Sequence, residues 1–113
     1  MRPVTQVLSA SGPGAPIVVD YRGPNFILEV SGVISGGGSL TWKLQYTTDD
    51  VFASGYTPAS GNWFDSTVTT LTAQTTSNAG QQPGPVTAVR FNLTVYASGT
   101  LTGKVICNSG FVA

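Results

Sequence analysis

The stretch VTAVRFNLTVYASGTLTGKVIC, residues 86–107, decides the fold class of this chain. Apolar and polar side chains alternate along it, which is the period of a β-strand with one face on a core and the other in solvent. Ser98-Gly99 interrupts the alternation and predicts a tight hairpin turn, because glycine tolerates positive φ. The side chains expected to point inward are Val89, Phe91, Leu93 and Val95 before the turn, and Leu101, Val105 and Cys107 after it.

Two segments nearer the N-terminus show the same alternation. NFILEVSGVI (25–34) and LTWKLQYT (40–47) are separated by SGGGS (35–39), a flexible turn, so the two segments are predicted to pair as an antiparallel hairpin. In the second segment the expected inward residues are Leu40, Trp42, Leu44 and Tyr46, and the expected outward residues are Thr41, Lys43, Gln45 and Thr47.

The remaining segments complete an all-β pattern, since helix signals are almost absent. Further strands are predicted at VTQVL (4–8), PIVVD (16–20) and STVTTLTA (66–73), with GNWFD (61–65) as a possible eighth and QTTSNAGQQPGP (74–85) as a long polar loop. About seven to eight antiparallel strands of this kind predict a two-sheet β-sandwich of jelly-roll-like type. We expect one domain over residues 1–113, with a Gly/Pro-rich N-terminal arm at about 1–15 and a short tail at about 108–113.

The charge composition excludes several classes of partner. Charged residues make up only 9% of the 113 residues, and five basic side chains balance five acidic ones. The chain therefore cannot assemble the basic stripe that nucleic-acid binding requires. Weak charge repulsion between copies favours a protein that is covered by neighbours in an assembly.

Membrane and secretion signals are also missing from the sequence. No segment has the apolar length that is needed to span a bilayer, and MRPVTQVLSASG at the N-terminus lacks the apolar core of a signal peptide. We expect a protein that folds in a cytoplasm and has no membrane partner.

Catalytic residue sets are not found. The chain has no histidine and a single cysteine, which excludes a Ser-His-Asp triad, the usual zinc sites and an internal disulfide. Cys107 is expected to pack as a small apolar residue. The five acidic residues show no spacing that selects a pair for glycoside hydrolysis. We expect no enzyme activity and no cofactor.

Three carboxylates lie in one segment, QYTTDDVFASGYTPASGNWFD (45–65). Asp49, Asp50 and Asp65 could bind calcium only if the loop folded back, because adjacent carboxylates in an extended chain diverge and no DxDxDG spacing is present. Carboxylates of this kind more often accept backbone N–H groups in turns. Turn capping is the favoured interpretation, and calcium binding is the alternative.

Aromatic residues in the same segment are the candidate contact residues. Tyr56, Trp63 and Phe64 could close one end of the sandwich, form a subunit contact, or make a small carbohydrate platform. Phe111 in the C-terminal tail could cover an open core end or dock on a neighbour. These four residues are the predicted interface, and a carbohydrate-binding module that uses Tyr56 and Trp63 is a second functional hypothesis.

Three short motifs occur in a fixed order between residues 40 and 107. WKLQYTTDDVF (42–52) ends a strand in a T-x-D-D-x-F turn, the W-F-D element follows at 63–65, and AVRFNLTVYASGTLTGKVI (88–106) closes the series. In this order they resemble the motifs of small β-sandwich virion structural proteins of tailed bacteriophages. The ending CNSGFVA (107–113) departs from the pattern of those proteins, which often stop soon after a Gln.

The resemblance implies a function that the residues alone do not specify. It implies a capsid cement or decoration protein that stabilises the coat-protein shell, with head-fibre, neck or tail components as alternatives. The implied partners are the major capsid protein and further copies of the chain, as a homo-oligomer that is a trimer by analogy. The implied location is the virion, assembled in the host cytoplasm.

Overall fold

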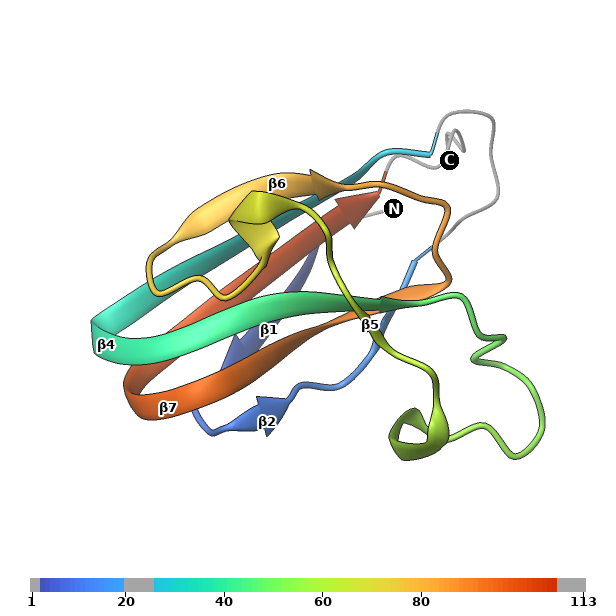
Figure 1. Cartoon of the computed structure of the whole chain (residues 1–113), viewed down its shortest axis with the longest axis horizontal. Helices are drawn as coiled ribbons and strands as arrows, with labels where there is room; N and C mark the ends of the chain where they lie inside the picture. The colour runs from blue at the N-terminus through green and yellow to red at the C-terminus, as the bar shows by residue number, and fades with distance from the viewer. Residues whose placement is uncertain (1–2, 20–25, 108–113) are drawn as a thin grey trace.

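Two strands of 20 residues form the centre of the molecule, β4 (Leu28–Thr47) and β7 (Ala88–Cys107). The structure is a computed structural model that describes residues 3–19 and 26–107. β4 and β7 pair antiparallel along nearly their whole length, from Leu28↔Cys107 to Thr47↔Ala88. Figure 1 shows the two ribbons running side by side toward one end of the molecule, where both turn back.

Glycines allow both strands to bend at the same level. Gly36 and Gly37 in β4 have φ of +71° and +65°, and Gly99 in β7 has φ of +90°. Residues with a Cβ atom rarely adopt such positive φ angles. A Cβ on Gly99 would also collide with the Cα of Gly38, so the two bends are in direct contact. The bends divide the β4–β7 ribbon into two halves.

We call these halves arm A and arm B. Arm A contains residues 28–35 of β4 and 100–107 of β7, and arm B contains residues 39–47 of β4 and 88–98 of β7. β1 (Val4–Leu8) and β6 (Asn78–Gln82) extend arm A on its two sides. β2 (Gly12–Pro13), β3 (Ile17–Val18) and β5 (Phe64–Asp65) extend arm B. The result is one seven-stranded antiparallel sheet.

The all-β antiparallel class is therefore confirmed, but both predicted hairpins are wrong. Residues 25–34 do not pair with 40–47, and the segments on the two sides of Ser98-Gly99 do not pair with each other; each half of β4 pairs with a half of β7 instead. The Gly-rich segments are corners of one bent sheet, not hairpin turns. The expected strand at 4–8 is present as β1, so part of the expected N-terminal arm belongs to the sheet. Of the possible strand at 61–65, only Phe64 and Asp65 pair, as β5.

The segment between β5 and β7 also differs from its prediction. Residues 66–73, predicted as a Thr-rich strand, contain the 3-10 helix η2 (Thr69–Leu71), and the predicted polar loop at 74–85 contains the strand β6. β6 has the sequence NAGQQ, which lacks the β-branched residues typical of strands. It pairs because arm A would otherwise leave the hydrogen-bonding groups of β4 uncovered at that edge.

The core lies between the two arms. Trp42 of arm B is fully buried, and its ring lies so close to Gly32 of arm A that a Cβ there would be 2.6 Å from Cζ2. Gly103 of arm A contacts the ring of Phe91 in the same way. Small residues on one arm thus make room for aromatic rings on the other. The buried apolar side chains are Ile17, Val19, Leu28, Val30, Leu40, Trp42, Leu44, Leu71, Val86, Ala88, Val89, Phe91, Leu93, Leu101, Val105 and Cys107.

Val95 is an exception to the predicted inward set, because its side chain is 58% exposed. The pairing shifts between Thr41↔Val95 and Trp42↔Leu93, which leaves Thr94 as an extra residue in β7. A bulge of this kind reverses the alternation beyond it. Tyr96 then packs against the core in place of Val95.

Candidate functional site

A long loop joins β4 to β5 at the end of arm B, and its carboxylates fix its shape. We call residues 48–63 the aromatic loop. Asp50 Oδ1 accepts the N–H of Phe52 at 3.1 Å, and Asp49 Oδ2 accepts the N–H of Asn62 at 2.7 Å, which ties the start of the loop to its end. Thr87 Oγ1 donates to the Asp49 carbonyl oxygen at 2.6 Å. The turn-capping interpretation of Asp49 and Asp50 is confirmed.

Asp65 lies apart from those two carboxylates. It belongs to β5, where Lys43 Nζ is 2.9 Å from its Oδ1 and Gln45 Nε2 donates to the same oxygen at 3.0 Å. Within residues 3–19 and 26–107, no group of three or more His, Cys, Asp and Glu side chains could hold a metal ion. The three carboxylates therefore serve two separate structural tasks.

Gln45 is the centre of a polar cluster on the outer face of arm B. We call Lys43, Gln45, Asp65, Arg90 and Asn92 the Gln45 cluster. Gln45 Oε1 accepts from Arg90 Nε at 2.9 Å and from Asn92 Nδ2 at 3.2 Å, while Nε2 donates to Asp65. Only 8% of Gln45 is exposed, so it is buried although it faces away from the core, as predicted. A buried amide with satisfied donors and acceptors fixes the geometry of its neighbours.

The aromatic loop packs over this cluster through Trp63. The guanidinium of Arg90 lies 4.3 Å from the centre of the Trp63 ring, a cation–π contact, and Trp63 Nε1 donates to the carbonyl oxygen of Pro58 at 3.1 Å. Burial lowers the pKa of the Arg90 guanidinium from its ordinary value. Trp63 thus joins the loop to the strands beneath it.

Asp65→Asn is expected to make the free energy of unfolding depend less on pH in the acidic range. The hydrogen bond from Gln45, followed by that from Lys43, lowers the pKa of the Asp65 carboxyl from its ordinary 3.8, against an opposing effect of burial. A carboxyl with a lowered folded pKa contributes stability above the unfolded pKa of about 3.9 and loses it as pH falls through the folded value. Because Asp65 is half exposed, we expect a contribution of at most about 1 kcal/mol at neutral pH.

Urea unfolding at pH 7 and at about pH 2.5 measures this effect. The difference between wild type and Asp65→Asn should be present at pH 7 and nearly absent at the lower pH. Glu29→Gln is the control, since Glu29 has no ion pair among the described residues. An equal difference in the free energy of unfolding between wild type and Asp65→Asn at both pH values would contradict a lowered pKa of Asp65.

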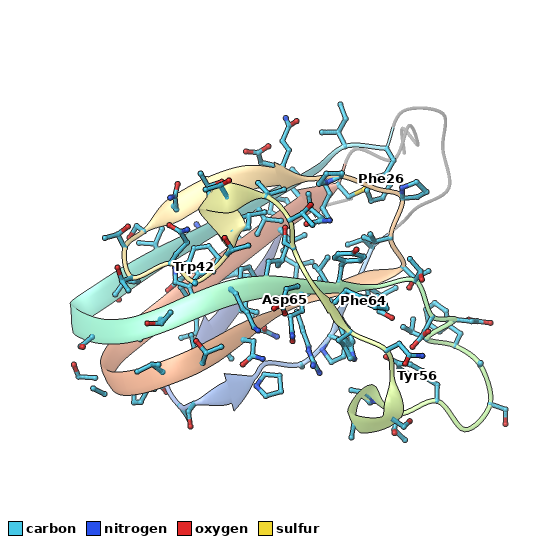
Figure 2. The ribbon with its side chains drawn as sticks, in the orientation of Figure 1. Phe26, Trp42, Tyr56, Phe64 and Asp65 are labelled. Atoms are coloured by element: carbon cyan, nitrogen blue, oxygen red, sulfur yellow. The ribbon has the colours of Figure 1, made fainter. Side chains whose placement is uncertain are left out.

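The aromatic side chains of the loop and of the adjoining strand β5 differ greatly in exposure. Phe52 is 80% exposed and Phe64 is 52% exposed, whereas Tyr56 and Trp63 are half-buried. Figure 2 shows Phe64 beside Asp65 on β5 and Tyr56 farther out in the loop. The Phe64 ring lies 5.9 Å from that of Tyr46, and the buried Tyr56 Oη has no hydrogen-bond partner among the described residues.

The sequence thus identified two aromatic residues of the loop, Tyr56 and Trp63, and the adjacent Phe64 of β5, but missed Phe52, which is the most exposed of the four. Phe52 follows Asp50 by two positions, where the N–H accepted by Asp50 orients the backbone. The T-x-D-D-x-F turn was the only signal for it. Phe111, the fourth predicted interface residue, lies outside the described residues.

Comparison with protein-family models, curated proteins and solved structures finds no match for this chain. Among the described residues, no helix is sufficiently long and apolar to cross a membrane. The function is therefore inferred from the surface of the molecule and from the motifs in its sequence.

Proposed function

We propose that the protein is a structural component of a bacteriophage virion, and specifically a cement or decoration protein that binds and stabilises the coat-protein shell. The observation that carries the proposal is Phe52, which is 80% exposed at a loop whose backbone is already held in place. The resemblance of residues 40–107 to small virion proteins, and the net charge of zero, support the same class of function.

The geometry of the aromatic loop fits a contact surface. Aromatic side chains at the centre of an interface supply much of its binding energy, and a loop ordered before binding avoids part of the entropy cost of ordering. Hydrogen bonds made by Asp49, Asp50 and Thr87 restrain the loop without any partner. Phe52 and Phe64 are then the side chains that a coat subunit would cover.

The proposal also includes the type of all-β fold. We place the bent sheet among jelly-roll-like two-sheet sandwiches, with the arms as its two layers. Contacts of Gly32 with Trp42 and of Gly103 with Phe91 across the core support this class. A compact unit without catalytic residues would act by bridging neighbouring coat subunits, and many repeated copies would make weak contacts effective.

The proposed partners are the major capsid protein and further copies of the chain, with the trimer implied by analogy, and the proposed location is the virion. Head-fibre, neck and tail components are the alternatives within the same class. The carbohydrate-binding hypothesis receives less support, because Arg90 covers one face of the Trp63 ring and the indole N–H is bonded to Pro58. A stacking platform for sugars needs an open aromatic ring, whereas Trp63 is half-buried and has one face occupied by Arg90.

A protein inventory of purified phage particles by mass spectrometry tests the proposal. We expect the chain to be present in many copies, and particles that lack it to release their DNA at a lower temperature or at low salt. Absence of the chain from purified particles would refute the proposed function. Its presence in only a few copies would instead support a neck or tail location.

Phe52→Ala is expected to reduce the occupancy of the protein on particles. Loss of an aromatic interface residue costs about 2 kcal/mol or more, which corresponds to roughly 30-fold weaker binding. Occupancy is measured by titrating purified protein onto particles that lack it, followed by sedimentation. Val95→Ala, which removes an exposed side chain from β7 away from the loop, is the matched control. Equal binding of both variants would contradict the role of Phe52.

A further inference from the structure

The outer face of arm A is an open, four-stranded surface that no described segment covers. The strands lie in the order β1, β7, β4, β6. Buried residues such as Val30 and Val105 point from one side of this sheet into the core, and the side chains on the other side point away from it. We call this surface the β1–β6 face. Its residues are Thr5 and Val7 of β1, Thr102, Lys104 and Ile106 of β7, Glu29, Ser31 and Val33 of β4, and Ala79 and Gln81 of β6.

Of the ten residues on this face, four are apolar, four are polar and uncharged, and two carry charges of opposite sign. Val7 is 61% exposed, Val33 50% and Ile106 43%. Glu29 and Lys104 are exposed, and neither forms an ion pair within the described part of the chain. The face therefore has no net charge, and neither of its charged groups has a partner of opposite sign within residues 3–19 and 26–107.

The strand register places the two charges on one diagonal of a rectangle of four residues. Lys104 pairs with Ser31, and Ile106 pairs with Glu29, across the β4–β7 ladder. Lys104 and Glu29 therefore occupy opposite corners, and Ser31 and Ile106 occupy the other two. A pattern with opposite charges on one diagonal is complementary to its own copy.

We propose that this face binds a second copy of the chain about a two-fold axis that lies in the plane of contact and passes over Ser31 and Ile106. Rotation about this axis sets Lys104 opposite the partner's Glu29, and Glu29 opposite the partner's Lys104. Ile106 then meets its own copy at the centre. The strands of the two faces cross at a steep angle, which is the orthogonal class of sheet packing.

The neighbouring positions agree with this axis. Val33 lies beyond Ser31 along β4, and Ala79 lies beside Ser31 on β6. The two-fold rotation exchanges the direction along β4 with the direction across to β6, so Val33 meets the partner's Ala79. Apolar groups thus meet apolar groups, while two symmetric Lys–Glu pairs neutralise the only charges on the face. Isologous contacts of this type are the commonest in homodimers.

The size of the face limits the expected affinity. Four strands about 4.8 Å apart, each contributing roughly five residues at about 3.3 Å, cover less area than a standard stable interface. We expect a dissociation constant in the micromolar range. The pairing is two-fold, unlike the trimer implied by the resemblance, and it does not depend on whether the protein belongs to a virion.

Charge exchange at the two corners tests the proposal. Sedimentation equilibrium from about 1 μM to 1 mM should show the wild type passing from monomer to dimer. Glu29→Lys and Lys104→Glu should each shift the midpoint at least tenfold toward the monomer, because each brings like charges together. The double variant Glu29→Lys/Lys104→Glu restores both pairs and should return the midpoint close to that of wild type.

Two further measurements make the result independent of charge effects on folding. Ser31→Cys places a thiol on the axis and should form an intermolecular disulfide under a mild oxidant, whereas Ser39→Cys, at the bend, should not. Val33→Asp should abolish the dimer, and Val95→Asp, an equally exposed valine on arm B, should leave it unchanged. A wild type that remains monomeric at 1 mM, a trimer, or a double variant that is not restored would each overturn the proposal.

Discussion

Trp42→Ala is expected to lower the free energy of unfolding by about 3–5 kcal/mol, the usual cost of truncating a large buried aromatic residue. Trp42 is fully buried, its ring lies 6.0 Å from that of Phe91, and its Nε1 donates to the carbonyl oxygen of Thr76 at 3.1 Å. The substitution leaves a cavity between the arms and a carbonyl without its donor. Because domains of this size are stable by only about 5–15 kcal/mol, the variant should be close to unfolding at 37 °C.

Urea unfolding followed by far-UV circular dichroism measures this loss, with the second tryptophan as the control. Trp63→Ala removes an equally large side chain from the outer face, where it is half-buried. Loss of its cation–π contact and of one hydrogen bond should cost about 1–2 kcal/mol. Equal losses for the two tryptophans would contradict the placement of the core between the arms.

Gly103→Ala is expected to destabilise the protein by about 1–3 kcal/mol, although it adds only one methyl group. A Cβ at this position collides with the ring of Phe91 on the opposite arm, and Phe91 is itself fully buried. The ring cannot move without displacing Trp42 beside it. An added methyl group at this closely packed contact therefore opposes the approach of the two arms.

A double-mutant cycle tests this explanation directly. In a Phe91→Leu background the collision is relieved, so Gly103→Ala should cost less than about 1 kcal/mol there. Denaturant unfolding of the four proteins gives the interaction free energy. Additive costs, with no rescue by Phe91→Leu, would show that the glycine is required for another reason.

The local part of this fold could be predicted from the sequence, because alternation reports which face of a strand is buried. Phe91, Leu93 and Val105 lie in the core as expected, and Asp50 caps the turn as expected. Alternation carries no information about which strand pairs with which. That is the reason why residues 25–47 and 86–107 were each predicted as a hairpin, while the structure pairs β4 with β7.

The remaining errors have specific physical causes. β6 is held by its partner strand and not by its own propensity, so its polar sequence gave no signal. The bulge at Thr94, which turns Val95 outward, depends on the register with Thr41. Gln45 was assigned correctly to the outer face, but its burial arises from residues far along the chain, Asp65 and Arg90. Each of these features depends on a contact that is distant in sequence.

The pairing of β4 with β7 also has a consequence for how the chain reaches its native state. At the end of this ladder, a hydrogen bond joins Thr87 to Thr47, which are 40 positions apart in the sequence. Every residue pair of the ladder itself is separated by a longer stretch of sequence. Closing so large a loop is slow, and proteins dominated by such contacts fold in milliseconds to seconds. We expect the hydrogen bonds between β4 and β7 to form first near Thr47 and then in order toward Leu28. During synthesis the pairing of β4 with β7 can begin only after residue 88 has emerged from the ribosome, so β4 must wait without this partner strand while the 40 residues between the two strands are made.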